Sequence, residues 1–325
     1  MYCLRPFYMM IVEPGGECRS CCEAHASKSF GNILRDGPEG VWRGEGAREM
    51  RESILDGSYR FCLDGCPIYQ RVLALRESGG DPRTGTMDLG ACVSREPMGR
   101  DLEWPAHLHV GHDTRCNIRC RKCHHWTIEV DEAETDRVGD LCLGMLPHAS
   151  GLAMSGCGEL FFSPSYAKVL RGVEAMPNLF KMHAITNGTL LTPGRWGSLG
   201  DVASKIARGS LRVSVDAATR ETYDKVRRGG DFDVLAANLR FLGSRPISQK
   251  LMSMVVEMDN FREMPAFVRL AAEWGFRAVF EQVIGPDGWK PWIDDAPERE
   301  EFEALLAESL AMANLLWTNF QGAGR

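Results

Sequence analysis

The sequence lacks any apolar run long enough to cross a membrane. Its best apolar stretch near the N-terminus, residues 7–12, is also too short for the core of a secretory signal peptide. The net charge of −6 at pH 7 leaves no excess of basic residues, which a general nucleic-acid-binding protein would carry. We therefore expect a cytoplasmic protein that binds neither membranes nor nucleic acid.

Cysteine is missing from the whole chain after Cys157, although the residues up to that point hold all twelve cysteines. Disulfide bonds are rare in the cytoplasm, so this number of cysteines requires another explanation. One or two of them would be ordinary buried thiols. Twelve cysteines gathered in clusters predict metal binding.

Four regions of the 325-residue chain differ in composition. Residues 1–67 hold six cysteines among short strand-like and helix-like segments, and they predict a small α+β domain. Residues 68–104 are rich in Gly, Arg, Asp and Pro and predict a connector. Residues 105–290 alternate β-rich runs with helical stretches, and residues 291–325 predict a C-terminal helical segment.

Six β-rich runs separated by helical stretches predict a parallel sheet with crossover helices, and therefore an α/β fold. Ligands of such sheets bind beyond the C-terminal ends of the strands. The runs are AHLHV (106–110), GLAMS (151–155), KMHAIT (181–186), SLRVSV (210–215), LMSMVVE (251–257) and RAVFEQV (277–283).

Three cysteines follow the first of these runs within the stretch "GHDTRCNIRCRKCHH". Cys116, Cys120 and Cys123 form the pattern C-x3-C-x2-C on a loop where the site of such a fold belongs. A structural zinc ion or a 4Fe-4S cluster usually takes four protein ligands, so three thiolates leave one metal position open. On spacing alone, a zinc site completed by His124 or His125 is the alternative.

This pattern after the first strand resembles the signature of the radical SAM superfamily. The resemblance implies a partial (β/α)6 TIM-like barrel in which Cys116, Cys120 and Cys123 hold a 4Fe-4S cluster whose open iron binds S-adenosylmethionine (SAM). It also implies a one-electron reductant such as flavodoxin or ferredoxin, cleavage of SAM to a 5′-deoxyadenosyl radical, and hydrogen abstraction from the substrate. Lys122 departs from the pattern, because the superfamily usually has an aromatic residue there; Trp126 is the alternative neighbour of adenine.

Three downstream motifs extend the resemblance. The first, "SGCGEL" (155–160), resembles a Gly-Gly-Glu element. The second, "ITNGTLLT" (185–192), resembles a Thr-Asn-Gly strand end. The third, "VSVDAATRETYDKVRRGGDFD" (213–233), resembles a Ser-x-Asp turn with an Arg-Gly-Gly segment. By resemblance, the glycines allow close approach of SAM, the glutamate accepts from its ammonium, and an arginine pairs with its carboxylate. A solvated helix end is the alternative for the arginines. The implied SAM-binding residues are Gly156, Gly158, Glu159, Thr186, Asn187, Ser214, Arg227 and Arg228.

The first 67 residues resemble the SPASM or twitch module, which binds auxiliary 4Fe-4S clusters and in relatives usually follows the barrel. The four cysteines assigned to one auxiliary cluster are Cys3, Cys21, Cys62 and Cys66. Four thiolates close a site completely, which favours electron transfer over substrate ligation. Cys18 and Cys22 are spares, either of which would replace Cys21, and zinc is the alternative on spacing alone.

Three further residues are catalytic candidates. Cys157 would donate a hydrogen atom to a substrate radical, as epimerases of this superfamily require, or it is a small residue in a tight turn. Glu257 and Glu281 end the fifth and sixth β-rich runs, where carboxylates are substrate binders, bases or surface charges. Cys142 is expected in the core, and Cys92 in the connector has no assigned role.

The resemblance implies an enzyme, a radical SAM oxidoreductase or epimerase with one auxiliary cluster. We expect it to act on a sugar-like or cyclitol-like intermediate of natural-product biosynthesis. The alternative within the class is a peptide maturase that oxidises, crosslinks or epimerises a ribosomal peptide. A zinc-stabilised binding protein without catalysis is the alternative from another class.

Overall fold

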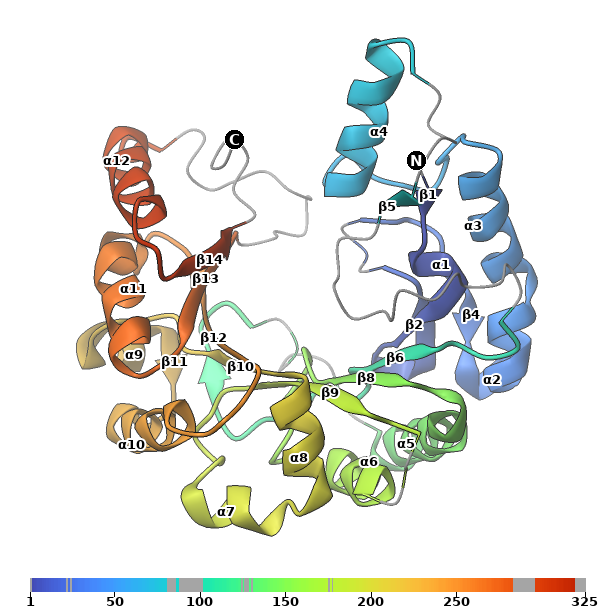
Figure 1. Cartoon of the computed structure of the whole chain (residues 1–325). Coiled ribbons are helices and arrows are strands. Elements are labelled where there is room, and N and C mark those ends of the chain that lie inside the picture. Colours follow the sequence, from blue (N-terminus) through green and yellow to red (C-terminus); the bar gives the residue numbers. More distant parts are fainter. Residues whose placement is uncertain are drawn as a thin grey trace. The chain divides into compact units, whose positions relative to one another are not determined.

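The computed structural model (Figure 1) describes residues 2–21, 23, 25–80, 86–87, 102–123, 125, 129, 131–174, 176, 178–282 and 296–318. Two compact units divide the chain. The first unit comprises Met1–Thr114, Val130–Cys157 and Pro164–Lys181, and the second comprises Arg115–Glu129, Gly158–Ser163 and Met182–Arg325. The candidate residues outside the described ranges are Cys22, Cys92, His124 and Trp126. The domain boundaries at residues 67, 104 and 290 stay predictions.

The strands of the first unit are β1 (Tyr2–Cys3), β2 (Met9–Val12), β3 (Glu17–Arg19), β4 (Gly31–Asn32), β5 (Thr86–Met87), β6 (His107–Val110) and β8 (Gly151–Met154). Its main sheet has the strand order β8-β6-β2-β3-β4. β2 pairs in parallel with β6, which pairs in parallel with β8, whereas β3 and β4 are antiparallel. A strand of the cysteine-rich region therefore continues the parallel sheet begun by the first two β-rich runs.

The helices of the first unit are α1 (Arg5–Tyr8), α2 (Ile33–Arg43), α3 (Glu45–Leu55), α4 (Pro67–Glu77), α5 (Glu132–Met145) and α6 (Pro164–Glu174). Helix α5 begins at the N-cap Asp131, whose side chain accepts a hydrogen bond from the Glu134 amide at 2.9 Å. Its buried side chains, including Val138, Cys142 and Met145, recur at helical spacing and face α2 and α6. Cys142 is therefore a core residue.

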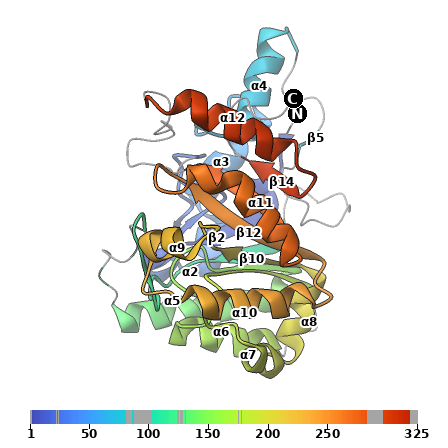
Figure 2. The same ribbon diagram turned by 90° about the vertical axis from the view of Figure 1, so that its left-hand side faces the viewer.

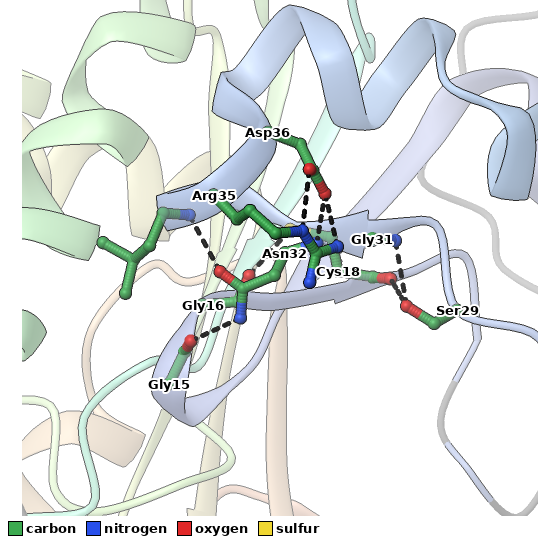
Figure 3. A network of polar contacts seen from close by, with 9 residues as sticks. Gly15, Gly16, Cys18, Ser29, Gly31, Asn32, Arg35 and Asp36 are labelled. Carbon is green, nitrogen blue, oxygen red and sulfur yellow. Dashed lines mark hydrogen bonds and ion pairs between the residues drawn. The ribbon is translucent and has the colours of Figure 1, made fainter.

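Asn32, the N-cap of α2, links this helix to the turn before β3 (Figure 3). Its Oδ1 accepts from the Leu34 amide at 2.9 Å, and its Nδ2 donates to the Gly15 carbonyl at 2.8 Å. The Asn32 amide in turn donates to the Asp36 carboxylate at 3.1 Å. These bonds fix the β3–β4 hairpin, in which the fully buried Cys18 thiol donates to the backbone, 3.5 Å from the Gly16 carbonyl.

The strands of the second unit are β7 (Arg119–Cys120), β9 (Lys181–Thr186), β10 (Ser210–Ser214), β11 (Arg227–Arg228), β12 (Gln249–Val256), β13 (Arg277–Gln282) and β14 (Leu315–Thr318). Its main sheet is parallel throughout, in the order β14-β13-β12-β10-β9. β7 and β11 form a separate antiparallel pair. Apolar side chains alternate along β9 and β10, where Met182, Ala184, Leu211 and Val213 are fully buried.

The helices of the second unit are α7 (Pro193–Ser198), α8 (Asp201–Arg208), α9 (Arg220–Val226), α10 (Phe232–Gly243), α11 (Met264–Glu273) and α12 (Arg299–Leu310). α11 packs against β13 and α12, and Figure 2 shows α11 beside α12. Helix N-caps recur directly after strands: Asp231 accepts from the amides of Asp233 and Val234 before α10. Strand ends and the following helices are thus joined by short capped loops.

All six predicted β-rich runs are strands, namely β6, β8, β9, β10, β12 and β13. The parallel pairing and the helices between these strands confirm the predicted α/β class with a (β/α)6 succession of elements. The cysteine-rich α+β region precedes it, as expected. Among the described residues, no helix combines the length and apolar character that crossing a bilayer requires.

Candidate functional site

The three-cysteine loop is held at its backbone by the segment that follows α9. Cys120 lies in β7 opposite Arg227 in β11. The Arg121 amide donates to the Val226 carbonyl at 2.9 Å, and the Cys123 amide donates to the Cys120 carbonyl at 3.2 Å. The three thiols are half-buried. The Arg-Gly-Gly segment therefore helps to fix the conformation of the loop.

Two of the three sulfurs face hydrogen-bond donors from the downstream motifs. Asn187 Nδ2 lies 3.7 Å from the Cys116 sulfur and also donates to Asn117 Oδ1 at 2.9 Å. Arg227 Nη1 lies 3.3 Å from the Cys120 sulfur. Burial raises the pKa of Cys116 to about 11. Burial also raises the pKa of Cys120, while the Arg227 charge opposes that rise.

Glu159 joins the loop after β8 to the end of β9. Its Oε1 accepts from Thr186 Oγ1 at 2.6 Å and from the Phe161 amide at 3.1 Å, and its Oε2 accepts from the Asn187 amide at 2.6 Å. The residue is 1% exposed, and this burial raises the pKa of its carboxyl. A carboxylate can accept about four hydrogen bonds. Glu159 already accepts three, so its carboxylate can accept one more.

Arg227 and Arg228 have opposite environments. The Arg227 side chain is 10% exposed, and its Nη2 lies 2.6 Å from Asp216 Oδ2. Asp216 sits at the turn after β10 with a φ of 62°, and its Oδ1 accepts from the Val255 amide at 2.8 Å. Arg228 is exposed. The alternative interpretation, a solvent-exposed helix end, therefore fits Arg228, which is exposed. It does not fit Arg227, which is buried and paired with Asp216.

Ser214 ends β10 and is half-buried, with its hydroxyl 3.5 Å from that of Ser253 on β12. Glu257 follows β12, is 6% exposed, and lies 3.7 Å from Lys122 Nζ. Burial raises the pKa of the Glu257 carboxyl, and the Lys122 charge opposes that rise. Lys122, the unexpected residue of the cysteine loop, is thus an ion-pair partner at the end of a barrel strand.

Glu281 has a partner within the sheet. It lies on β13 and forms an ion pair with Arg212 of β10. Both side chains are partly exposed, at 28% and 22%. The structure therefore places Glu281 in a strand, paired with a strand residue, whereas Glu257 lies beyond the end of its strand.

The thiols of Cys3, Cys21, Cys62 and Cys66 gather in the first unit. Burial raises the pKa of Cys3, and the neighbouring Cys21 and Cys62 raise it further. Burial raises the pKa of Cys62 to about 12, with Cys66 and Cys21 adding to the rise. Such mutual effects require short distances, because charge interactions fade with separation. These cysteines are thus neighbours in pairs, and their assignment to one site stays a prediction.

Cys18 lies in β3, near a cysteine of a helix. Apart from burial, the neighbour that most raises its pKa is Cys142 of α5. Arg5, by contrast, donates a hydrogen bond to Cys21 and lies close to Cys3. Cys18 is thus a neighbour of Cys142, and a guanidinium lies next to Cys21.

The SGCGE turn after β8 is built on positive φ angles. Gly156 has a φ of 119° and Gly158 a φ of 59°, which disfavour other residues. The Cys157 carbonyl accepts from the Tyr166 hydroxyl at 3.0 Å. His109 of β6 lies 2.7 Å from the Ser155 carbonyl through its Nε2. A half-buried Cys157 on such a turn fits the interpretation as a small residue, and its sulfur chemistry stays a prediction.

Family comparison identifies the N-terminal module. Residues 3–67 match the SPASM family model, described as an iron–sulfur cluster-binding domain. This match and the similarity to the curated relatives below support the expected radical SAM enzyme with a SPASM module. Members of this superfamily bind SAM and a 4Fe-4S cluster, and the SPASM domain binds auxiliary iron–sulfur clusters.

The curated relatives to which this chain is similar have different names and activities. GTP 3',8-cyclase of Chlorobaculum tepidum is 25% identical over 206 residues, which cover 62% of this chain and 59% of the relative. Mycofactocin maturase MftC of Mycolicibacterium smegmatis is 32% identical over 93 residues, covering 28% of this chain and 22% of the relative. The chain thus spans at most about three-fifths of the length of these relatives.

Among solved structures, Streptococcus suis SuiB bound to S-adenosylmethionine aligns with 84% of this chain and 60% of its own. The sequence identity is 12% and the TM-score 0.46. The structure of TYW1 with a lysine–pyruvate adduct aligns with 62% of this chain and 72% of its own, at 17% identity and a TM-score of 0.43.

The donor sets fit the clusters that the family binds. The sets of three and four cysteines offer the number of thiolates that an open and a closed 4Fe-4S cluster take. Free thiols beside Arg and Asn donors suit a thiolate-bound cluster, since those donors stabilise sulfur charge.

Sequence reasoning missed Asp216, Asn117 and Asp259. Asp216 is the aspartate of the Ser-x-Asp turn. Its position directly after a β-rich run is the feature of the sequence that could have identified it. Asp259 pairs with Arg121 of the cysteine loop and, at 2.5 Å, with Lys225 of α9. No local sequence pattern predicts these ion pairs, because Asp259 is far along the chain from Arg121 and Lys225.

Proposed function

We propose that this protein is a radical SAM enzyme whose catalytic cluster is held by Cys116, Cys120 and Cys123. When bound and reduced, the cluster supplies the electron that cleaves SAM to a 5′-deoxyadenosyl radical, which abstracts hydrogen from the substrate. One observation carries the proposal: donors from two separate motifs, Asn187 and Arg227, meet sulfurs of the same three-cysteine loop. A one-electron reductant such as flavodoxin or ferredoxin would serve the reaction.

The residues at the strand ends would bind SAM beside that loop. Glu159 holds the Thr186–Asn187 strand end and has one acceptor position left for the ammonium. The positive φ angles of Gly156 and Gly158 permit a close backbone approach. Ser214 ends β10, where the SAM ribose or carboxylate would lie, and the exposed Arg228 is available to pair with the carboxylate.

The N-terminal cysteines would hold one auxiliary cluster, ligated by Cys3, Cys21, Cys62 and Cys66. Their mutual proximity supports this set over one that includes Cys18. Four protein thiolates leave no iron free for the substrate, which favours a role in accepting or passing an electron.

A peptide and a small molecule are equally well supported as the substrate class. The mycofactocin maturase relative supports the peptide alternative, and the GTP 3',8-cyclase relative supports a small molecule. A sugar-like or cyclitol-like substrate and an epimerase outcome remain predictions. Glu257 is the best-placed catalytic candidate, because its buried carboxylate lies beyond the end of β12. Cys157 and Glu281 are weaker candidates, since a turn and the Arg212 pair account for them.

Anaerobic reconstitution tests this proposal. The full chain should bind about eight irons, as two 4Fe-4S clusters require. With dithionite and SAM it should form 5′-deoxyadenosine, measured by liquid chromatography. Cys120→Ala should abolish that product, whereas the buried-core control Cys142→Ala should retain it. A colourless protein with stoichiometric zinc, or product formation by Cys120→Ala, would contradict the proposal.

A further inference from the structure

We propose that Arg227 is a positioning residue of the catalytic cluster that sets its reduction potential through Cys120, and that Asp216 holds Arg227 in place and moderates its charge. This inference rests on the proposed function. It starts from the strand register, because β11 pairs antiparallel with β7 and places Arg227 opposite Cys120. Arg227 Nη1 then lies 3.3 Å from the Cys120 sulfur.

The guanidinium is fixed on its other side by Asp216. Nη2 of Arg227 lies 2.6 Å from Asp216 Oδ2, and the two side chains are only 10% and 12% exposed. Asp216 is itself anchored, since its Oδ1 accepts from the Val255 amide at 2.8 Å and its carbonyl accepts from Asn260 Nδ2 at 2.9 Å. Arg227 therefore cannot turn away from the sulfur without breaking a buried ion pair.

A buried cation next to a ligand thiolate changes the energy of cluster reduction. Reduction adds one negative charge to the cluster, and a hydrogen bond to a ligand sulfur stabilises that added charge. Arg227 should therefore raise the reduction potential. Asp216 carries the opposite charge and is paired with Arg227, so it should lower the potential and offset part of the effect of Arg227.

Substitutions of the two residues should therefore shift the reduction potential of the cluster in opposite directions. A purely structural role for the pair would not produce opposite shifts. Arg227→Gln removes the positive charge, and Asp216→Asn removes the negative one. At a fixed solution potential, Arg227→Gln should lower the ratio of reduced to oxidised cluster about tenfold, equivalent to about 59 mV for a one-electron couple. Asp216→Asn should raise that ratio, and Arg227→Lys, which keeps the charge, should lie between Arg227→Gln and the wild type.

The measurement is a redox titration of the reconstituted full chain, followed by electron paramagnetic resonance. The cluster of the Cys116 loop is recognised as the signal that changes when SAM is added, which separates it from the auxiliary cluster. Arg220→Gln is the matched control, because Arg220 also forms an ion pair with an aspartate of this unit but is 53% exposed. Its midpoint should equal that of the wild type.

Shifts in opposite directions for Arg227→Gln and Asp216→Asn would support the inference. Unchanged midpoints, or shifts of both variants in the same direction, would overturn it while leaving the proposed function intact. A wild-type chain without any SAM-responsive cluster would overturn the proposed function, and this inference with it. If Arg227→Gln fails to retain iron, Arg227→Lys provides the deciding comparison with Asp216→Asn.

Discussion

Glu159→Gln tests whether one buried carboxylate organises the end of β9. The substitution keeps the shape of the side chain, so it creates no cavity. The retained oxygen can take the place of Oε1, which accepts from Thr186 Oγ1 and the Phe161 amide. The new amide nitrogen then faces the Asn187 amide across 2.6 Å, where two donors meet without an acceptor.

The expected cost follows from these three bonds. Losing the charge-assisted bond from the Asn187 amide costs about 2 kcal/mol, and the two remaining bonds weaken as their acceptor becomes neutral. Relief of a buried charge works in the other direction, since burial raises the pKa of the Glu159 carboxyl. We expect a net loss of about 2 kcal/mol, or about 4–8 °C in Tm for a cooperative unit of 150–250 residues.

The assay is the thermal unfolding of the cluster-free chain under reducing conditions, followed by circular dichroism. Glu273→Gln on the exposed face of α11 is the matched control and should leave Tm unchanged. A double-mutant cycle with Thr186→Val adds a second criterion. Thr186→Val removes the bond from Thr186 Oγ1 that Glu159→Gln only weakens, so the two substitutions together should cost less than the sum of their separate costs. A Tm within about 1 °C of the wild type, or strict additivity in the cycle, would refute this account of Glu159.

Three further predictions concern the first unit. Cys21→Ala should lower the iron content from about eight to about four per chain, whereas Cys18→Ala should leave it near eight, as measured after anaerobic reconstitution. Tyr166→Phe should destabilise the chain by about 1–3 kcal/mol in urea unfolding, because the hydroxyl bonds both the amide and the carbonyl of Asp113. Burial lowers the pKa of His109, so its folded pKa lies below the unfolded value and its contribution to stability is lost as pH falls through the folded pKa. His109→Asn should therefore lose less Tm than the wild type between about pH 7.5 and pH 5.5, and an equal loss would contradict the assignment.

Much of the fold could be predicted from local sequence patterns. The six β-rich runs, with helical stretches between them, specified parallel strands because an apolar run of this length needs cover on both faces. Capping residues such as Asp131 and Asp231 mark helix starts, since their side chains satisfy free amides at that point. The joining of β2 to β6 had no local signal, because strand pairing depends on residues about a hundred positions apart.

The sequence by itself predicted two groups of cysteines, and the match of residues 3–67 to the SPASM model supports iron–sulfur binding for the first of them. Only the tertiary structure decided the partners of those groups. It placed Cys18 near Cys142, Lys122 beside Glu257, and Arg227 between Cys120 and Asp216. The physical reason is that hydrogen bonds and ion pairs depend on distance in space, whereas a motif records only distance along the chain.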